Sequence, residues 1–180
     1  MKRVIPKVVT MVCIVSMILG LYQPVSVKAY AYQNNELSKI CIGGKYIIER
    51  GEYIQSTVAG DRGTAKYDVE NNVLTLDNFE TNYPININYI DGITIIINGE
   101  SKIHNTGGTA FNIYETGIAT IVGKNNGKIT IESGTDYNEG GAGISCSSDV
   151  LNLKDLTINI TVAVGGCLGA ITLNVENCDI

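Results

Sequence analysis

The sequence predicts an all-β protein built as a solenoid, in which successive coils of the chain stack through parallel strand pairing. Short runs of alternating Ile, Leu, Val and Thr recur along residues 63–180, and Gly, Asn and Asp interrupt each run. Like segments also follow one another at steps of about twenty to thirty residues. The strands of a sandwich often recur every ~8–12 residues, so the longer step favours stacked coils.

The N-terminal segment, residues 1–31, has the pattern of a secretory signal peptide. A basic start with Lys2, Arg3 and Lys7 precedes an apolar run at residues 8–21, which is short for a membrane span. Small residues place the expected cleavage site after Ala29 or after Ala31. An uncleaved N-terminal anchor helix is the alternative. We expect a secreted, extracellular or cell-surface protein with no membrane span after cleavage.

The charge of the mature chain excludes one class of partner. Removing residues 1–31 removes four of the 13 basic residues and none of the 18 acidic ones, which leaves a net charge of −9. Such a surface repels phosphate backbones, so we expect no nucleic-acid partner. We expect no cofactor, except that calcium is expected to bridge to the ligand if the ligand is an acidic polysaccharide.

Four cysteines remain after signal removal: Cys41, Cys146, Cys167 and Cys178. They allow three complete disulfide pairings, among which the sequence does not choose. No CxxC spacing occurs, which argues against a zinc site. We expect most of the four to be small buried apolar residues, the usual state of free cysteine.

Residues 32–62 are expected to form an N-terminal β cap. The run ICIGGKYII at residues 40–48 is strand-like, residues 49–52 suit a turn, and residues 53–60 suit a returning strand. A solenoid needs such a cover, because an open coil end exposes unpaired backbone groups.

Residues 63–180 are expected to form the parallel coils. Using Leu74, Ile95, Ile121, Leu151 and Ile171 as equivalent positions gives steps of 21, 26, 30 and 20 residues. A second series advances with the first and comprises Ile87, Ile113, Ile144 and Leu168. The insertions fall in the glycine-rich connections between the two series.

Alternation within the runs assigns the two faces of each expected strand, because successive side chains point to opposite faces. The inward positions are expected to be Leu74, Leu76, Phe79, Ile93, Ile95, Ile97, Ile121, Ile129, Ile131, Leu151, Leu153, Leu156, Ile158, Ile171 and Leu173. The outward positions are expected to be Thr75, Thr94, Thr130, Asn152, Thr157 and Thr172. Stacked coils would share a core that one coil could not form alone.

Polar breaks inside the runs are expected to be corners. Asp77-Asn78 interrupts the first run, and Asn98-Gly99, residues 125–127 and Lys154-Asp155 take the equivalent place in later runs. Asn, Asp and Gly tolerate the left-handed backbone that such a corner can need.

The run GTAKYDVENNVLTLDNF, residues 63–79, resembles the opening signature of a family of secreted clostridial carbohydrate-binding domain-containing proteins. ITIIINGESKI and GAGIS resemble the family's later repeats, and the resemblance covers residues 39–180. It implies a right-handed parallel β-helix that binds a plant-type polysaccharide, cellulose or acidic pectin, at the surface of anaerobic Gram-positive bacteria. The chain departs from the family in having no Trp and in stopping at Ile180 within a coil. We therefore expect a fragment of a longer protein, or a protomer that self-associates end to end.

If tyrosines and amides contact a sugar, the candidate tyrosines are the four in the connections between strands: Tyr83, Tyr89, Tyr114 and Tyr137. Aligning the Asn-Ile pairs of NINY and FNIY leaves Tyr89 and Tyr114 one position out of register, so no regular ladder is expected. Packing of the tyrosines over loop edges is the alternative interpretation.

The expected function is non-catalytic polysaccharide binding. No GxSxG, HExxH or P-loop motif is present, and we assign no catalytic residue and no metal ligand. His104 is expected to be an exposed residue of a polar loop, and the acidic neighbours Asp149 and Asp155 to be surface and corner residues. A polysaccharide lyase or hydrolase is the alternative, because related folds host such enzymes. A passive surface or adhesion module without a sugar site is the second alternative.

Overall fold

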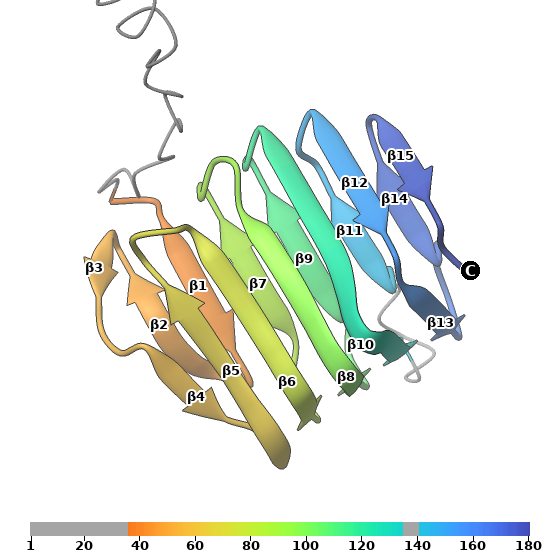
Figure 1. Ribbon diagram of the computed structural model, residues 1–180, viewed down its shortest axis with the longest axis horizontal. Coiled ribbons are helices and arrows are strands. Elements are labelled where there is room, and N and C mark those ends of the chain that lie inside the picture. The colour runs from red at the N-terminus through yellow and green to blue at the C-terminus, as the bar shows by residue number, and fades with distance from the viewer. Residues whose placement is uncertain (1–35, 135–140) are drawn as a thin grey trace, which may run out of the picture.

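A computed structural model describes residues 36–134 and 141–180. The described chain is all-β and contains no helix, which confirms the predicted class (Figure 1). It forms two mixed sheets that face each other across one core. The expected signal peptide, residues 1–31, and Tyr137 lie outside the described residues.

Each sheet runs from antiparallel strands near the N-terminus to parallel strands near the C-terminus. Sheet A contains, in spatial order, β14 (Leu168–Ala170), β11 (Ile144–Cys146), β9 (Phe111–Tyr114), β7 (Ile85–Asn88), β1 (Lys39–Ile42), β2 (Lys45–Glu49) and β3 (Glu52–Tyr53). Sheet B contains β15 (Leu173–Glu176), β12 (Val150–Lys154), β10 (Ile118–Ser133), β8 (Thr94–Asn105), β6 (Val73–Thr81), β5 (Arg62–Asp68) and β4 (Thr57–Ala59). β13 (Thr157–Val162) pairs with the second half of β10.

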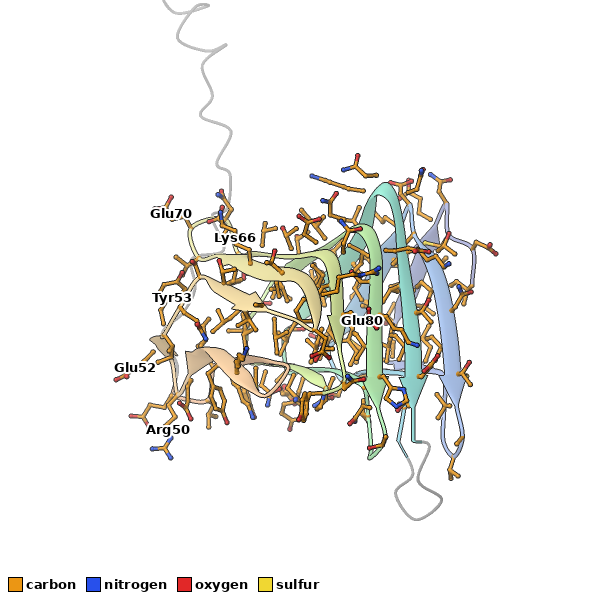
Figure 2. All side chains as sticks on the ribbon, turned by 90° about the horizontal axis from the view of Figure 1, so that it is seen from below. Arg50, Glu52, Tyr53, Lys66, Glu70 and Glu80 are labelled. Carbon is orange, nitrogen blue, oxygen red and sulfur yellow. The ribbon has the colours of Figure 1, made fainter. Side chains whose placement is uncertain are left out.

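The antiparallel strands occupy one end of the molecule. β1 pairs antiparallel with β2 and with β7, and β5 pairs antiparallel with β4 and with β6. β5 spans the expected boundary at residues 62 and 63 and completes this antiparallel part. Figure 2 shows Arg50 and Glu52 projecting from this end, where the edge strands β3 and β4 have only two and three residues. Short edge strands limit pairing with another chain.

The parallel register confirms the first two predicted steps and corrects the next two. Leu74 pairs with Ile95, and Ile95 pairs with Ile121. Ile121 then pairs with Leu153, and Leu153 pairs with Val175. The expected equivalent positions Leu151 and Ile171 were therefore wrong. Leu153 lies two residues beyond its expected equivalent and Val175 four beyond.

Sheet A shows the same kind of displacement. Ile87 pairs with Ile113 as expected, but Ile113 pairs with Cys146, two residues beyond Ile144. Displacements by even numbers of residues leave every side chain on its own face, because side chains alternate with period two. The errors in register therefore leave the predicted assignment of inward and outward side chains unchanged.

The core confirms the inward assignment except at the last strand. Thirteen of the fifteen expected inward residues are at most 2% exposed. Ile171 and Leu173 are 71% and 40% exposed, so their expected burial was wrong. β15 is the end strand of sheet B, and no further strand of the described chain packs over it. The expected outward residues are all partly or fully exposed.

The expected corners have the left-handed backbone predicted for them, but Asn78, Gly99 and Asn125 lie within β6, β8 and β10 of sheet B, so the expectation that the chain turns there from one sheet to the next was wrong. Asn78, Asn125, Asn126 and Asp155 have φ between 45° and 58°, and Gly99 has φ 71°. The positive φ favours glycine at position 99, and a Cβ there would lie 2.5 Å from Asn78 Oδ1 and displace the Asn78 side chain.

Amide side chains connect these corners from one strand to the next. Asn98 Nδ2 donates to Asp77 Oδ1 at 2.9 Å, and Asn125 Nδ2 donates to Asn98 Oδ1 at 2.7 Å. Farther along, Asn177 Nδ2 donates to Asp155 Oδ1 at 3.1 Å. The choice of Asn and Asp at the corners thus serves both the left-handed backbone and the stacking of neighbouring strands.

The run of residues 63–79 contains a buried polar contact that fixes its turn. The Tyr67 hydroxyl donates to Asn72 Oδ1 at 2.9 Å, and Asn72 Nδ2 donates to the carbonyl of Asp91 at 2.7 Å. Tyr67 and Asn72 are 1% and 2% exposed. Asp68 Oδ1 accepts the N–H groups of Glu70 and Asn71 within the turn. These contacts explain why an aromatic-Asp pair precedes Asn in this run.

Replacing Tyr67 with Phe is expected to destabilise the protein by about 1–3 kcal/mol. The substitution keeps the ring but leaves the buried Asn72 oxygen without this donor, which costs its desolvation. Urea unfolding measures the change. Tyr53→Phe, on a 44% exposed ring of β3, is the control and should shift stability by less than about 0.5 kcal/mol. Equal stability of the Tyr67 variant and the parent chain would contradict the structural role of this contact.

Candidate functional site

The outer face of sheet A carries a continuous set of polar and aromatic side chains. Ile and Phe residues of β7, β9 and β11 point into the core, so the residues between them point outward. We define the sheet A face as Lys39, Cys41, Tyr46, Asn86, Asn88, Asn112, Tyr114 and Ser145. Side chains of neighbouring strands on this face lie side by side, because the strands are in register.

Two rows cross the sheet A face. In the first row, Asn86 pairs with Asn112, and Asn112 pairs with Ser145. In the second row, Asn88 of β7 lies between Lys39 of β1 and Tyr114 of β9. Amides and hydroxyls both donate and accept hydrogen bonds, so these rows offer both kinds of partner to a ligand.

Tyr89 and Tyr114 form an aromatic pair at the end of the second row. Their ring centroids are 5.5 Å apart, and the ring planes make an angle of 74°. The predicted register offset is confirmed, because Asn88 rather than Tyr89 pairs with Tyr114. The Tyr89 and Tyr114 rings are nevertheless in contact, and Tyr89 has a left-handed backbone with φ 54°. Partial burial and the hydrogen bond with Tyr114 raise the pKa of the Tyr89 hydroxyl.

The structure places the four expected tyrosines unequally. Tyr114 is 39% exposed and lies beside Tyr89, on the sheet A face. Tyr83 is 59% exposed but precedes β7, whereas Tyr89 follows it, so these two lie at opposite ends of the strand. Sequence reasoning missed Tyr46, because it lies in the expected cap and not in a connection between coils.

Two further features of the sheet A face concern charge and unsatisfied polarity. Lys39 Nζ lies 5.5 Å from the centroid of the Tyr46 ring. The buried oxygen Asn88 Oδ1 has no hydrogen-bond partner among the described residues. Buried polar atoms of this kind are uncommon in folded proteins. The row that ends in the tyrosine pair therefore combines a cation, an unsatisfied amide and an aromatic ring.

A second polar cluster lies on the outer face of sheet B. His104 Nδ1 and Lys102 Nζ lie 2.9 and 3.2 Å from the two oxygens of Glu132. The expectation that His104 lies in a polar loop was wrong, because β8 continues to Asn105 and pairs His104 with Glu132 of β10. Hydrogen bonds from His104 and from Lys102 lower the pKa of the Glu132 carboxyl, and the bond from His104 has the larger effect.

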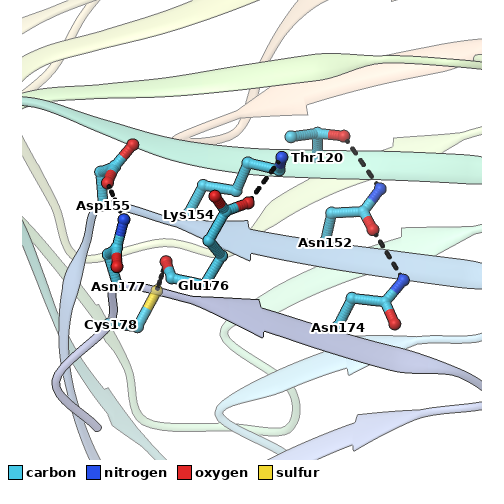
Figure 3. A network of polar contacts seen from close by, with 8 residues as sticks. All are labelled: Thr120, Asn152, Lys154, Asp155, Asn174, Glu176, Asn177 and Cys178. Carbon is cyan, nitrogen blue, oxygen red and sulfur yellow. Dashed lines mark hydrogen bonds and ion pairs between the residues drawn. The ribbon is translucent and has the colours of Figure 1, made fainter.

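Polar side chains also connect the last strands (Figure 3). Asn174 Nδ2 donates to Asn152 Oδ1 at 2.9 Å, which continues a chain of contacts from Thr120. Lys154 Nζ lies 2.9 Å from Glu176 Oε2 and, as the figure shows, does not converge on Asp155. These contacts run between neighbouring strands and need no ligand to account for them.

The remaining candidate groups within the described residues are the acidic side chains, His104 and the cysteines. No cluster of three or more His, Cys, Asp or Glu side chains is placed to hold a metal ion in the described ranges. The four cysteines are unpaired, with Cys41 and Cys146 buried and Cys167 exposed. Burial raises the pKa of the Cys41 thiol.

Comparisons with known proteins give no relative to which this site could be compared. No helix within residues 36–134 and 141–180 is long and apolar enough to span a bilayer. No protein-family model, no curated protein and no solved structure matches the chain.

Proposed function

We propose that the protein is a secreted or cell-surface module that binds a plant-type polysaccharide, such as cellulose or pectin, without catalysis. In this proposal the chain winds as a right-handed parallel β-helix, closed at one end by the antiparallel strands β1 to β5. The in-register parallel pairs of both sheets support the winding. The resemblance of residues 63–79 to secreted carbohydrate-binding proteins supports the function.

The Tyr89–Tyr114 pair on the sheet A face is the observation that carries the proposal. Tyrosine offers an apolar ring face for a sugar and a hydroxyl for one of its oxygens. An edge-on partner holds a ring in place, which lowers the entropy lost when a ligand binds. The neighbouring rows of Asn and Ser supply the hydrogen bonds that sugar hydroxyl groups require.

The regular spacing of the sheet A face suits a long polymer. Neighbouring strands in a sheet lie about 4.8 Å apart, so each row repeats polar groups at that interval. A polysaccharide chain laid across β7, β9 and β11 would meet similar groups at successive strands. Many weak contacts along one polymer add to a useful affinity, because the second contact is intramolecular.

The enzymatic alternative would use the His104, Lys102 and Glu132 cluster. A glycosidase needs one carboxylic acid that is protonated at working pH. The pKa of Glu132 is instead lowered by its basic neighbours, which favours a permanent carboxylate. A combined assay for reducing ends and unsaturated products on cellulose, xylan and polygalacturonate tests this alternative. Activity that disappears in His104→Ala would replace the binding proposal with a catalytic one.

Replacing Tyr114 with Ala is expected to weaken polymer binding at least tenfold, which corresponds to about 1.4 kcal/mol. The change removes the exposed ring of the pair, and aromatic rings commonly dominate binding energy. Affinity electrophoresis in gels containing each polymer measures the change. Tyr53→Ala, which removes a comparably exposed ring at the capped end, is the control. Equal retardation of the two variants would contradict the assigned site, and no retardation of the parent chain would favour a passive surface module.

A further inference from the structure

We propose that the sheet A face selects polysaccharides that carry an anionic group, a carboxylate or a sulfate ester, and that Lys39 contacts this group directly. This inference rests on the proposed function and adds to it the chemical class of the ligand. It differs from recognition through a bridging calcium ion, because the positive charge belongs to the protein itself.

Lys39 is the single positively charged residue of the sheet A face. Glu49 follows Ile48, which pairs with Ile40, so this exposed acid of β2 is a neighbour of Lys39, but the two side chains form no ion pair. The Lys39 ammonium group takes part in none of the five ion pairs among the described residues. By contrast, Lys102, Lys128 and Lys154 on sheet B each face a Glu carboxylate at 3.2 Å or less. Lys39 thus forms no ion pair with a carboxylate of the described chain.

The position of Lys39 is held by its neighbours. Its Nζ lies over the Tyr46 ring, an arrangement that stabilises a cation while leaving its N–H groups able to donate. Pairing of β1 with β7 sets Lys39 opposite Asn88, and pairing of β7 with β9 sets Asn88 opposite Tyr114. The backbones of Lys39 and Tyr114 are therefore two strand spacings apart, about 9.6 Å, and the Lys39 ammonium group lies toward β2, over Tyr46.

This spacing fits a ligand that uses both groups at once. A sugar ring packed on Tyr114 would extend its substituents over Asn88 toward Lys39. The Asn88 side chain, whose oxygen lacks a partner in the described chain, lies between them. An anionic substituent at Lys39 would form a charge-assisted hydrogen bond, which is stronger than a neutral one. A neutral polymer would keep the stacking contact and lose this bond.

The test measures binding of the mature chain, in EDTA, to four polymers. They are polygalacturonate, its fully methyl-esterified form, dextran sulfate and cellulose. The variants are Lys39→Met, which keeps an apolar side chain beside Tyr46, and Lys39→Arg, which keeps the charge. Lys66→Met is the control, because it removes one positive charge from an exposed position of β5 in sheet B.

The parent chain is expected to bind polygalacturonate or dextran sulfate at least tenfold more tightly than the methyl ester, and the preferred anion identifies the natural group. Lys39→Met should abolish this preference while retaining binding to the methyl ester, which also shows that the variant is folded. Lys39→Arg and Lys66→Met should keep the preference. Equal binding of the charged and esterified polymers in EDTA, including a preference that appears only when EDTA is replaced by calcium, would overturn this inference and leave the proposed function standing. Binding to none of the four would instead refute the proposed function.

Discussion

Replacing Ile95 with Asp is expected to unfold the parallel part of the protein, whereas Thr94→Asp should be tolerated. Ile95 is fully buried between Leu74 and Ile121 of the neighbouring strands. An unpaired carboxylate there costs several kcal/mol, a large share of the roughly 5–15 kcal/mol that stabilises a domain. Thr94 is adjacent in sequence but points outward, where a carboxylate stays hydrated.

Thermal unfolding followed by circular dichroism compares the two variants. Thr94 pairs with Val73 and Thr120, so Asp at this position faces no charged residue on either neighbouring strand. Its melting temperature should stay within a few degrees of the parent chain, and Ile95→Asp should show no cooperative transition. Similar melting curves for both variants would show that the strand faces are assigned incorrectly.

The fold features that the sequence predicts are those encoded locally. Alternation of apolar residues correctly places Leu74, Ile95 and Ile121 on the core face, because successive side chains of a strand point to opposite faces. The left-handed backbone of the corners is predicted as well, since Asn78 and Gly99 are residue types that tolerate a left-handed backbone.

Several features that depend on pairing between distant segments were not predicted. The even-numbered displacements at Leu153 and Val175 leave the alternation pattern unchanged, so the pattern cannot detect them. In the candidate site, Lys39 lies beside Asn88 only because β1 pairs antiparallel with β7. Contact between Tyr89 and Tyr114 forms at a left-handed residue, although their register alone suggests separation.

The last strand, β15, presents an edge that is expected to drive self-association of the 180-residue chain. The carbonyls of Thr172 and Glu176 accept bonds from Leu151 and Asp155, at 2.8 and 3.0 Å. Because backbone groups alternate in direction, those of Leu173 and Val175 point to the open side of sheet B. Leu173 and Val175 are also 40% and 48% exposed. An open edge with apolar side chains is a template for a strand of another chain.

Two copies can pair their β15 strands in antiparallel fashion about a two-fold axis. A pairing centred on Asn174 sets Leu173 opposite Val175 of the second copy, and Glu176 opposite Thr172. This register keeps the inward side chains on one face and places no like charges opposite each other. The edge strands at the other end of each chain, β3 and β4, have only two and three residues and offer no comparable surface.

Sedimentation over a hundredfold range of concentration is expected to show a chain of residues 32–180 shifting from monomer toward dimer. Val175→Pro should keep it monomeric, because proline removes an N–H group that points away from β12 and so leaves the pairing within the chain intact. Ile171→Ser is the matched control: it removes a 71% exposed side chain just outside β15 and keeps the strand edge. Dimers in Ile171→Ser but not in Val175→Pro would identify strand pairing as the cause. A parent chain that stays monomeric throughout would contradict the prediction, and equal loss of dimers in both variants would assign association to apolar contact in place of the strand edge.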